Sequence, residues 1–193
     1  MKKLLYTAAG LAIVIAIASV ACQAPKAENS AAPVSVEDKV KRGEYLVNTI
    51  GCDDCHSPKK MGPMGPEVDP EYRFGGHLAD RPIGPIDTSV LTKGWALFGG
   101  ELTVAVGPWG VSYAANISGD STGIGAWTEE QFFRAMREGK YKGLENSRPL
   151  LPPMPWQNFA KLTDEDLSAI YHYLKSTKPV NNVVPAPKLL SQL

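Results

Sequence analysis

Two cysteines and a histidine stand within six residues in the segment GCDDCH, residues 51–56. Cys52 and Cys55 are three positions apart, so on a helix their side chains lie about one turn apart on one face, and His56 follows directly. This spacing is typical of three kinds of site: a redox-active dithiol, one half of a zinc site, and a covalent attachment point for haem. Because each kind needs a different local fold, this segment constrains the chain more than any other.

The rest of the sequence separates these three kinds of site. A structural zinc site needs four ligands, and the remaining histidines, His77 and His172, do not form a second paired spacing. A redox dithiol lies between a strand and a helix in a βαβ unit, whereas this motif ends a predicted helix and precedes a loop rich in Gly and Pro. The pattern therefore favours haem.

A haem site would use the side chains of this motif in distinct ways. The thiols of Cys52 and Cys55 add to the two vinyl groups on one porphyrin edge, and His56 binds the iron through Nε2. We expect its Nδ1 proton to be donated to a backbone carbonyl of the following proline-rich loop, which would fix the ring. Asp53 and Asp54 are expected to be solvated. Because the motif occurs once, we expect one covalently bound haem c.

Residues 1–21 have the pattern of an export signal, with a basic start, an apolar run over 11–18 and the small residues Ser19-Val-Ala21 before Cys22. The pattern resembles a bacterial lipoprotein signal, and this resemblance implies that Cys22 is lipidated. An ordinary signal peptidase site and an uncleaved anchor helix are alternatives. All of them predict an exported protein, periplasmic or held at the outer face of a membrane.

Composition divides the remaining chain into three parts. Residues 22–35 are Ala, Pro and polar residues without an apolar period, which is typical of a flexible tether. Residues 36–180 form the predicted domain, and residues 181–193 form a C-terminal tail. The chain carries 20 Lys and Arg against 20 Asp and Glu, a balance that does not indicate nucleic-acid binding. The sequence contains no grouping of an acid, a base and a nucleophile that would indicate a small-molecule substrate.

Three helices are predicted within the domain, and they make it mainly α. The first covers about residues 36–50 with an apolar stripe that includes Val36, the second ends near residue 139, and the third precedes Pro179. Between the first two, residues 95–106 predict a small β-hairpin and residues 111–115 an extended segment within an ordered, loop-rich region. The residues expected to cap and end the helices are Ser35, Thr128 with Gln131, Gly139, and Thr163 with Asp166.

A methionine on a stiff loop is the predicted second ligand of the iron. Met154 lies in Leu151-Pro-Pro-Met-Pro155, where each proline fixes its own φ and restricts the residue before it. His77, in Phe74-Gly-Gly-His77, is the competing ligand. The other methionines and the last histidine are expected to have other roles, because they lie too close to His56 in sequence or on a helix beside a buried stripe: Met61, Met64, Met136 and His172.

The order of these motifs resembles that of a class I c-type cytochrome over roughly residues 36–180. A helix, GCDDCH, the segment PPMPW and a capped helix ending in KSTKPV follow one another as in that family. The resemblance implies that the first and last helices cross near Gly43 with the haem between them, and that a loop-rich insertion carries the small β-hairpin. The segments PWGVSYAANI, TGIGAW and LPPMPW further resemble one haem domain of the cytochrome subunits of bacterial membrane-bound alcohol and aldehyde dehydrogenases. Those subunits carry several CxxCH motifs, whereas this chain carries one.

The resulting expectation is a membrane-anchored electron carrier and not an enzyme. It would transfer single electrons between redox protein partners in or at the membrane, such as a dehydrogenase, a quinol-oxidising complex or a terminal oxidase. The alternative is a fixed haem subunit of a larger respiratory complex or dehydrogenase. A third possibility is a haem sensor with an open coordination position in place of Met154.

Overall fold

The computed structural model describes residues 34–193. The predicted export signal, Cys22 and most of the predicted tether lie outside the described residues. No helix within 34–193 is both long enough and apolar enough to cross a bilayer.

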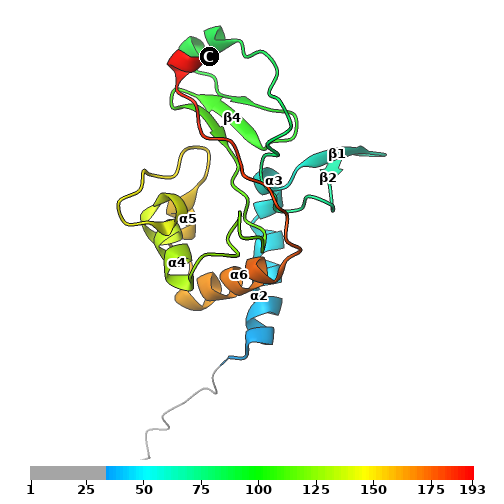
Figure 1. The fold of residues 1–193 in the computed structure, drawn as a ribbon, viewed down its shortest axis with the longest axis vertical. Helices are drawn as coiled ribbons and strands as arrows, with labels where there is room; N and C mark the ends of the chain where they lie inside the picture. Colours follow the sequence, from blue (N-terminus) through cyan, green and yellow to red (C-terminus); the bar gives the residue numbers. More distant parts are fainter. Residues whose placement is uncertain (1–33) are drawn as a thin grey trace, which may run out of the picture. The chain divides into compact units, whose positions relative to one another are not determined.

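The three predicted helices are present (Figure 1). Helix α2 covers Val36–Thr49, α4 covers Glu129–Glu138 and α6 covers Asp164–Ser176. The hydroxyl of Ser35 accepts a hydrogen bond from the Asp38 amide at the start of α2, and α4 begins with the predicted reciprocal capping box between Thr128 and Gln131. Two short helices, α3 (Cys52–His56) and α5 (Trp156–Phe159), follow α2 and precede α6, respectively.

Two details of these helices differ from the prediction. At the start of α6, Thr163 caps the Asp166 amide as expected, but the Asp166 carboxylate pairs with Arg42 of α2 at 2.9 Å instead of closing a capping box. Val36 is 62% exposed, and Leu46 is buried in α2 beside Val47. The first difference arises where α2 and α6 meet, and Leu46 packs in the hydrophobic cluster that includes residues of α6.

Helices α2 and α6 cross at Gly43. A Cβ atom built on this residue would overlap the carbonyl oxygen of Ala169 and would lie 2.7 Å from the Cβ atom of Tyr173. Real Cβ atoms do not approach their neighbours so closely, so only glycine permits this crossing. The close approach predicted from the sequence at Gly43 is therefore present.

Replacing Gly43 by alanine is expected to lower the free energy of unfolding by about 3 kcal/mol, because the new methyl group would push the two helices apart. Chemical denaturation monitored by circular dichroism measures this loss. The control is Gly84→Ala, since nothing lies within 4 Å of a Cβ atom at that position. The control is expected to change stability by less than about 1 kcal/mol. Equal effects of the two variants would contradict a tight crossing.

Two small antiparallel sheets occupy the region between α3 and α4. In the larger sheet the strand order is β3-β4-β5, with β3 at Leu97–Phe98, β4 at Val104–Gly107 and β5 at Gly110–Tyr113. The pairing of Leu97 with Val106 confirms the predicted hairpin, and β5 occupies most of the predicted extended segment. The sequence did not predict the second hairpin, β1 (Lys59–Gly62) with β2 (Gly65–Val68).

The described residues contain two hydrophobic clusters. The larger one joins α2, α4 and α6 and includes Phe132, Leu167, Ile170 and Leu174, and partly buried Cys52 packs against it. The smaller one lies on the three-stranded sheet, where β5 contributes the fully buried Val111. Short 3₁₀ turns at Thr88–Lys93, Tyr141–Gly143 and Leu190–Gln192 complete the elements. These helices and small sheets are compatible with a cytochrome c-like, mainly helical fold.

Residues 181–193 run along the domain from the end of α6 towards the larger sheet (Figure 1). The side-chain amide of Asn182 donates to the carbonyl oxygens of Gly75 and His77, and Lys188 pairs with Val111 of β5 through two backbone hydrogen bonds. This segment thereby joins the helical part of the domain to the sheet.

Candidate haem-binding site

Helix α3 carries the two cysteines and the histidine of the motif. It begins after Gly51, whose φ of 76° lies in the left-handed region that favours glycine. A Cβ atom at Gly51 would also lie 2.6 Å from the carboxylate of Asp54. Within the described chain Cys52 and Cys55 are free and partly buried, one turn apart on this helix. The motif thus forms a single rigid turn that follows directly from α2.

The surroundings of the two thiols favour their protonated form. Burial, reinforced by the charges of Asp53 and Asp54, raises the pKa of Cys52 to about 12. Burial also raises the pKa of Cys55, and Asp54 adds to the effect. A redox-active dithiol needs a thiolate with a lowered pKa, so this environment is the opposite of what exchange chemistry requires.

The ring of His56 is held by a backbone carbonyl. Nδ1 of His56 lies 2.7 Å from the carbonyl oxygen of Ala115, and because a carbonyl oxygen only accepts, the ring nitrogen donates. This bond fixes the tautomer in which Nε2 carries a free lone pair. Burial lowers the pKa of His56, which favours the neutral ring that binds metals.

His56 therefore donates to a backbone carbonyl, as predicted, but this carbonyl lies elsewhere in the sequence than expected. The carbonyl belongs to the segment after β5 and not to the proline-rich loop that follows the motif. That following loop contributes a different contact, in which the Gly76 amide donates to the carbonyl oxygen of His56.

Asp53 is not the solvated spacer that the sequence predicted. Its carboxylate pairs with Arg73 at 2.6 Å, and the hydrogen bonds that Arg73 donates to Asp53 raise the pKa of the guanidinium. The Asp53 carboxylate also accepts from the hydroxyl of Ser57, which in turn accepts from the Phe74 amide. Asp54 is exposed, as predicted. Arg73 and Phe74 thus anchor the outer side of α3, and no sequence signal marks Arg73 as the partner.

Met154 lies partly buried in the loop that precedes α5. On one side of it, Ser112 of β5 donates to the carbonyl oxygen of Pro152 at 2.6 Å. On the other side, the indole of Trp156 covers Gly139 so closely that a Cβ atom there would overlap the ring. The loop that carries Met154 is therefore tied to the sheet and to the end of α4.

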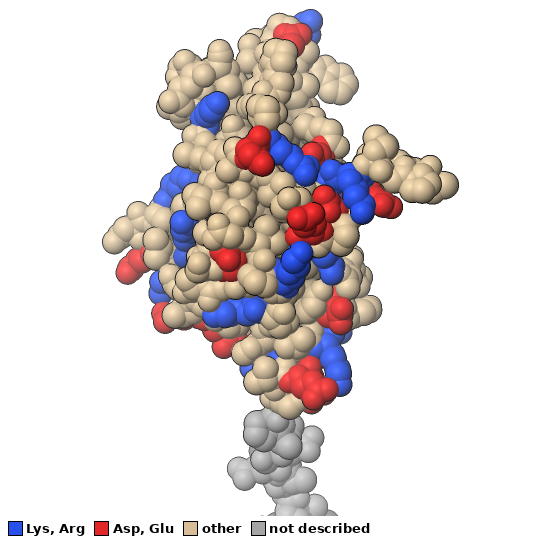
Figure 2. Space-filling view, turned by 45° about the vertical axis from the view of Figure 1, so that its right-hand side comes forward, with Lys and Arg blue, Asp and Glu red and all other residues tan. Residues whose placement is uncertain are grey.

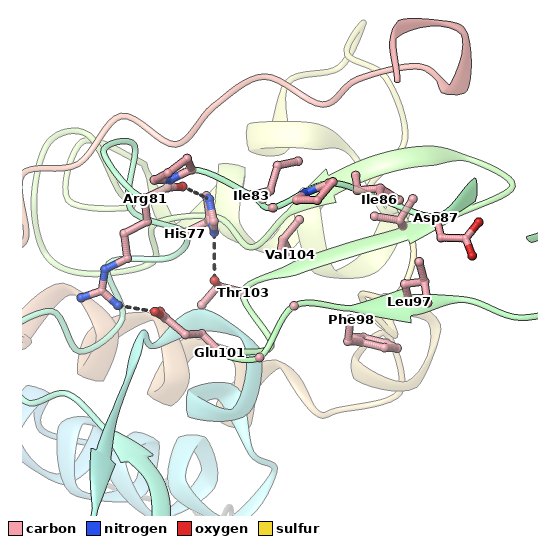
Figure 3. Close-up of a pocket in the computed structure, with 16 residues that line it drawn as sticks. His77, Arg81, Ile83, Ile86, Asp87, Leu97, Phe98, Glu101, Thr103 and Val104 are labelled. Carbon is pink, nitrogen blue, oxygen red and sulfur yellow. Dashed lines mark hydrogen bonds and ion pairs between the residues drawn. The ribbon is translucent and has the colours of Figure 1, made fainter. Parts of the chain in front are cut away.

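His77, the competing ligand, is buried with both ring nitrogens in hydrogen bonds (Figure 3). Nε2 lies 3.1 Å from the carbonyl oxygen of Arg81 and must donate, so Nδ1 accepts from the hydroxyl of Thr103 at 2.9 Å. Burial lowers the pKa of His77. Its ring adjoins a cavity of about 340 Å³ whose lining combines apolar side chains, such as Ile83 and Val104, with charged ones, such as Glu101. Neither nitrogen of His77 is free to bind iron in this arrangement.

The remaining methionines and histidine occupy the positions expected of other roles. Met61 and Met64 are exposed on the β1–β2 hairpin, and Met136 packs against the larger hydrophobic cluster. His172 is partly exposed and lies 3.9 Å from the carboxylate of Glu129.

Trp109, Trp127 and Trp156 are partly buried, whereas Trp95 is exposed. The indole of Trp109 donates to the hydroxyl of Ser112.

Charges of both signs are interspersed on the face shown in Figure 2. They lie mainly over the helical part and the β1–β2 hairpin, and few of them lie at the end of the domain that carries the larger sheet. This face therefore carries no single-sign field that would steer a strongly charged partner.

Comparison with known proteins identifies related cytochrome subunits. The chain is 30% identical over 152 residues to the fructose dehydrogenase cytochrome subunit of Gluconobacter japonicus, covering 77% of this chain and 23% of the relative. It is 33% identical over 135 residues to the gluconate 2-dehydrogenase cytochrome c subunit of Pantoea cypripedii, covering 69% and 22%. A shorter match, 41% over 83 residues, covers 42% of this chain and 7% of a nicotinate dehydrogenase subunit of Pseudomonas putida.

The chain spans about a quarter or less of the length of these relatives. No family model matches it. The names of the relatives imply that a domain of this kind binds haem c and transfers electrons. The resemblance predicted from the motifs is thus confirmed: over most of its length this chain is related to the cytochrome c subunits of bacterial dehydrogenases.

Proposed function

We propose that this chain is the mono-haem c-type cytochrome of a dehydrogenase complex and receives single electrons from a catalytic subunit. The relatives are cytochrome subunits of dehydrogenases, which favours the fixed-subunit alternative over a free carrier between respiratory complexes. The single observation in the structure that carries the proposal is the hydrogen bond from Nδ1 of His56 to Ala115, because it leaves Nε2 available directly after the two cysteines.

The residues of the site fit haem c in number and chemistry. Cys52 and Cys55 would hold it through two thioether bonds, and His56 and Met154 would bind its iron. Within residues 34–193, no three His, Cys, Asp or Glu side chains are grouped as the ligands of a single metal ion. When bound, haem c supplies a one-electron Fe(III)/Fe(II) couple, and methionine ligation favours a positive potential.

The protein's own residues orient and shield this group. Ala115 holds the imidazole of His56, and the ion pair between Asp53 and Arg73 holds the helix that carries both cysteines. The crossing of α2 and α6 at Gly43 gives this helix a firm base and supports a class I cytochrome arrangement. The chain thus supplies a positioned and partly buried site for the haem.

The proposed location is the outer face of a membrane. A lipid on Cys22 would anchor the chain there.

Purification of tagged chain in mild detergent tests the choice between a fixed subunit and a free carrier. A fixed subunit is expected to bring down a dehydrogenase catalytic subunit in about equal amount, and its substrate is expected to reduce the haem of the purified material. The control is the variant Cys22→Ala. This variant and the catalytic subunit bound to it are expected to be found in the soluble fraction and no longer in the membrane fraction. Recovery of the cytochrome alone, with no substrate able to reduce it, would contradict the subunit proposal.

A further inference from the structure

The segment that begins at the β4–β5 turn contacts both His56 and the loop that carries Met154. At its far end the carbonyl oxygen of Ala115 accepts from His56 at 2.7 Å. Three residues earlier, the hydroxyl of Ser112 donates to the carbonyl oxygen of Pro152 at 2.6 Å, two residues before Met154. Residues 112–115 therefore connect the histidine side of the site to the methionine side.

The hydrogen bonds of Ser112 have a defined direction. Indole nitrogen is only a donor, so the bond between Nε1 of Trp109 and Oγ of Ser112, 3.1 Å long, uses the hydroxyl oxygen as acceptor. The hydroxyl hydrogen is then free for one carbonyl. Pro152 at 2.6 Å is nearer than Ala105 at 3.4 Å. Trp109 thus orients Ser112 towards the loop.

The loop that carries Met154 has few other ways to be held. Pro152, Pro153 and Pro155 have no amide hydrogen, and the Met154 amide is used within the loop by the carbonyl oxygen of Leu151. Among the described residues, the bond from Ser112 is the one hydrogen bond that joins residues 151–154 to another element. Ser112 is only 7% exposed, so water competes little for this bond.

We propose that Ser112 is a positioning residue for Met154. It acts through the Pro152 carbonyl and holds the loop from which the Met154 thioether would bind the iron. This inference rests on the proposed function, in which Met154 binds the iron. A strand side chain suits the task, because the antiparallel pairing of Ser112 with Ala105 fixes its direction.

The test uses the full-length, haem-loaded protein and the variant Ser112→Ala. Carbon monoxide binds the reduced haem only when the coordination position of Met154 is vacant. The rate of carbon monoxide binding therefore reports how often the Met154 sulfur dissociates from the iron. We expect this rate to rise about tenfold, the change that follows from losing one buried hydrogen bond. The far-red absorption band of methionine-bound Fe(III) is expected to weaken. Ser112→Thr keeps the hydroxyl and is expected to restore most of the wild-type behaviour.

The matched control is Ser168→Ala. Ser168 is also 7% exposed and its hydroxyl is also hydrogen-bonded, to Lys39 on α2, but it lies on α6. We expect the control to leave the carbon monoxide rate and the far-red band unchanged. Thermal unfolding of both variants measures any general loss of stability.

The outcomes separate this inference from the proposed function on which it rests. An unchanged rate and band in Ser112→Ala would overturn the positioning role while leaving methionine ligation intact. Equal rate changes in Ser112→Ala and Ser168→Ala would also overturn it, because the effect would then be general loosening. A wild-type protein without the far-red band would overturn methionine ligation itself, and the role of Ser112 with it.

Discussion

Replacing both Cys52 and Cys55 by serine is expected to reduce covalently bound haem from one per chain to none. Serine hydroxyls do not add to vinyl groups, so haem bound by His56 and Met154 alone would be lost on extraction with acidic acetone. Haem stain on a denaturing gel and pyridine haemochrome spectra of the same sample measure the change. Each single variant keeps one thioether and is expected to retain haem with a shifted haemochrome band.

The matched control for these variants is Cys22→Ser, because Cys22 is the one other cysteine in the sequence. It is expected to keep one covalent haem per chain. Haem that stays covalently bound in the double variant would contradict the role of both cysteines.

Replacing Met154 by alanine is expected to abolish the far-red band of the oxidised protein and to open the iron to carbon monoxide in the reduced protein. Methionine ligation raises the potential of a haem with a histidine on its other face. The midpoint potential is therefore expected to fall by on the order of 0.1 V. Absorption spectra in both oxidation states and a redox titration measure these changes.

The control for Met154 is Met64→Ala, since the Met64 side chain is 100% exposed at the end of the β1–β2 hairpin. It is expected to leave the spectra and the potential unchanged. Survival of the far-red band in Met154→Ala would contradict ligation by this residue. If Met154→Ala does not bind carbon monoxide, and the further substitution His77→Ala restores binding, then His77 is the ligand of the iron. In that case the His77 ring would have to give up its hydrogen bonds to Thr103 and Arg81.

The sequence predicted those features of the fold that depend on neighbouring residues. The capping box of Thr128 and Gln131 forms because its partners are three positions apart and need nothing else. The same local pattern at Thr163 and Asp166 gave only half of the expected bonds, because Arg42 lies far away in sequence and near in space. The β1–β2 hairpin was missed because its glycines and prolines hide the alternation that marks a strand.

The candidate site likewise contains residues that the sequence predicted and residues that it did not. The motif itself indicated Cys52, Cys55 and His56, and the prolines indicated Met154. The residues that hold them were not predictable, because each bond joins segments that are distant in the sequence. Ala115 acts through its backbone, which no side-chain pattern reveals, and Arg73 is one of many basic residues that could have met Asp53. Only the folded chain shows that one segment reaches both His56 and the loop of Met154.

The central claim is that this chain holds one covalent haem between His56 and Met154. Pyridine haemochrome analysis of the exported wild-type protein, combined with its oxidised absorption spectrum, tests this claim most directly. We expect one haem c per chain, resistant to acidic acetone, together with the weak far-red band of methionine-bound Fe(III). The absence of covalent haem, or one haem without that band and with rapid carbon monoxide binding, would contradict it.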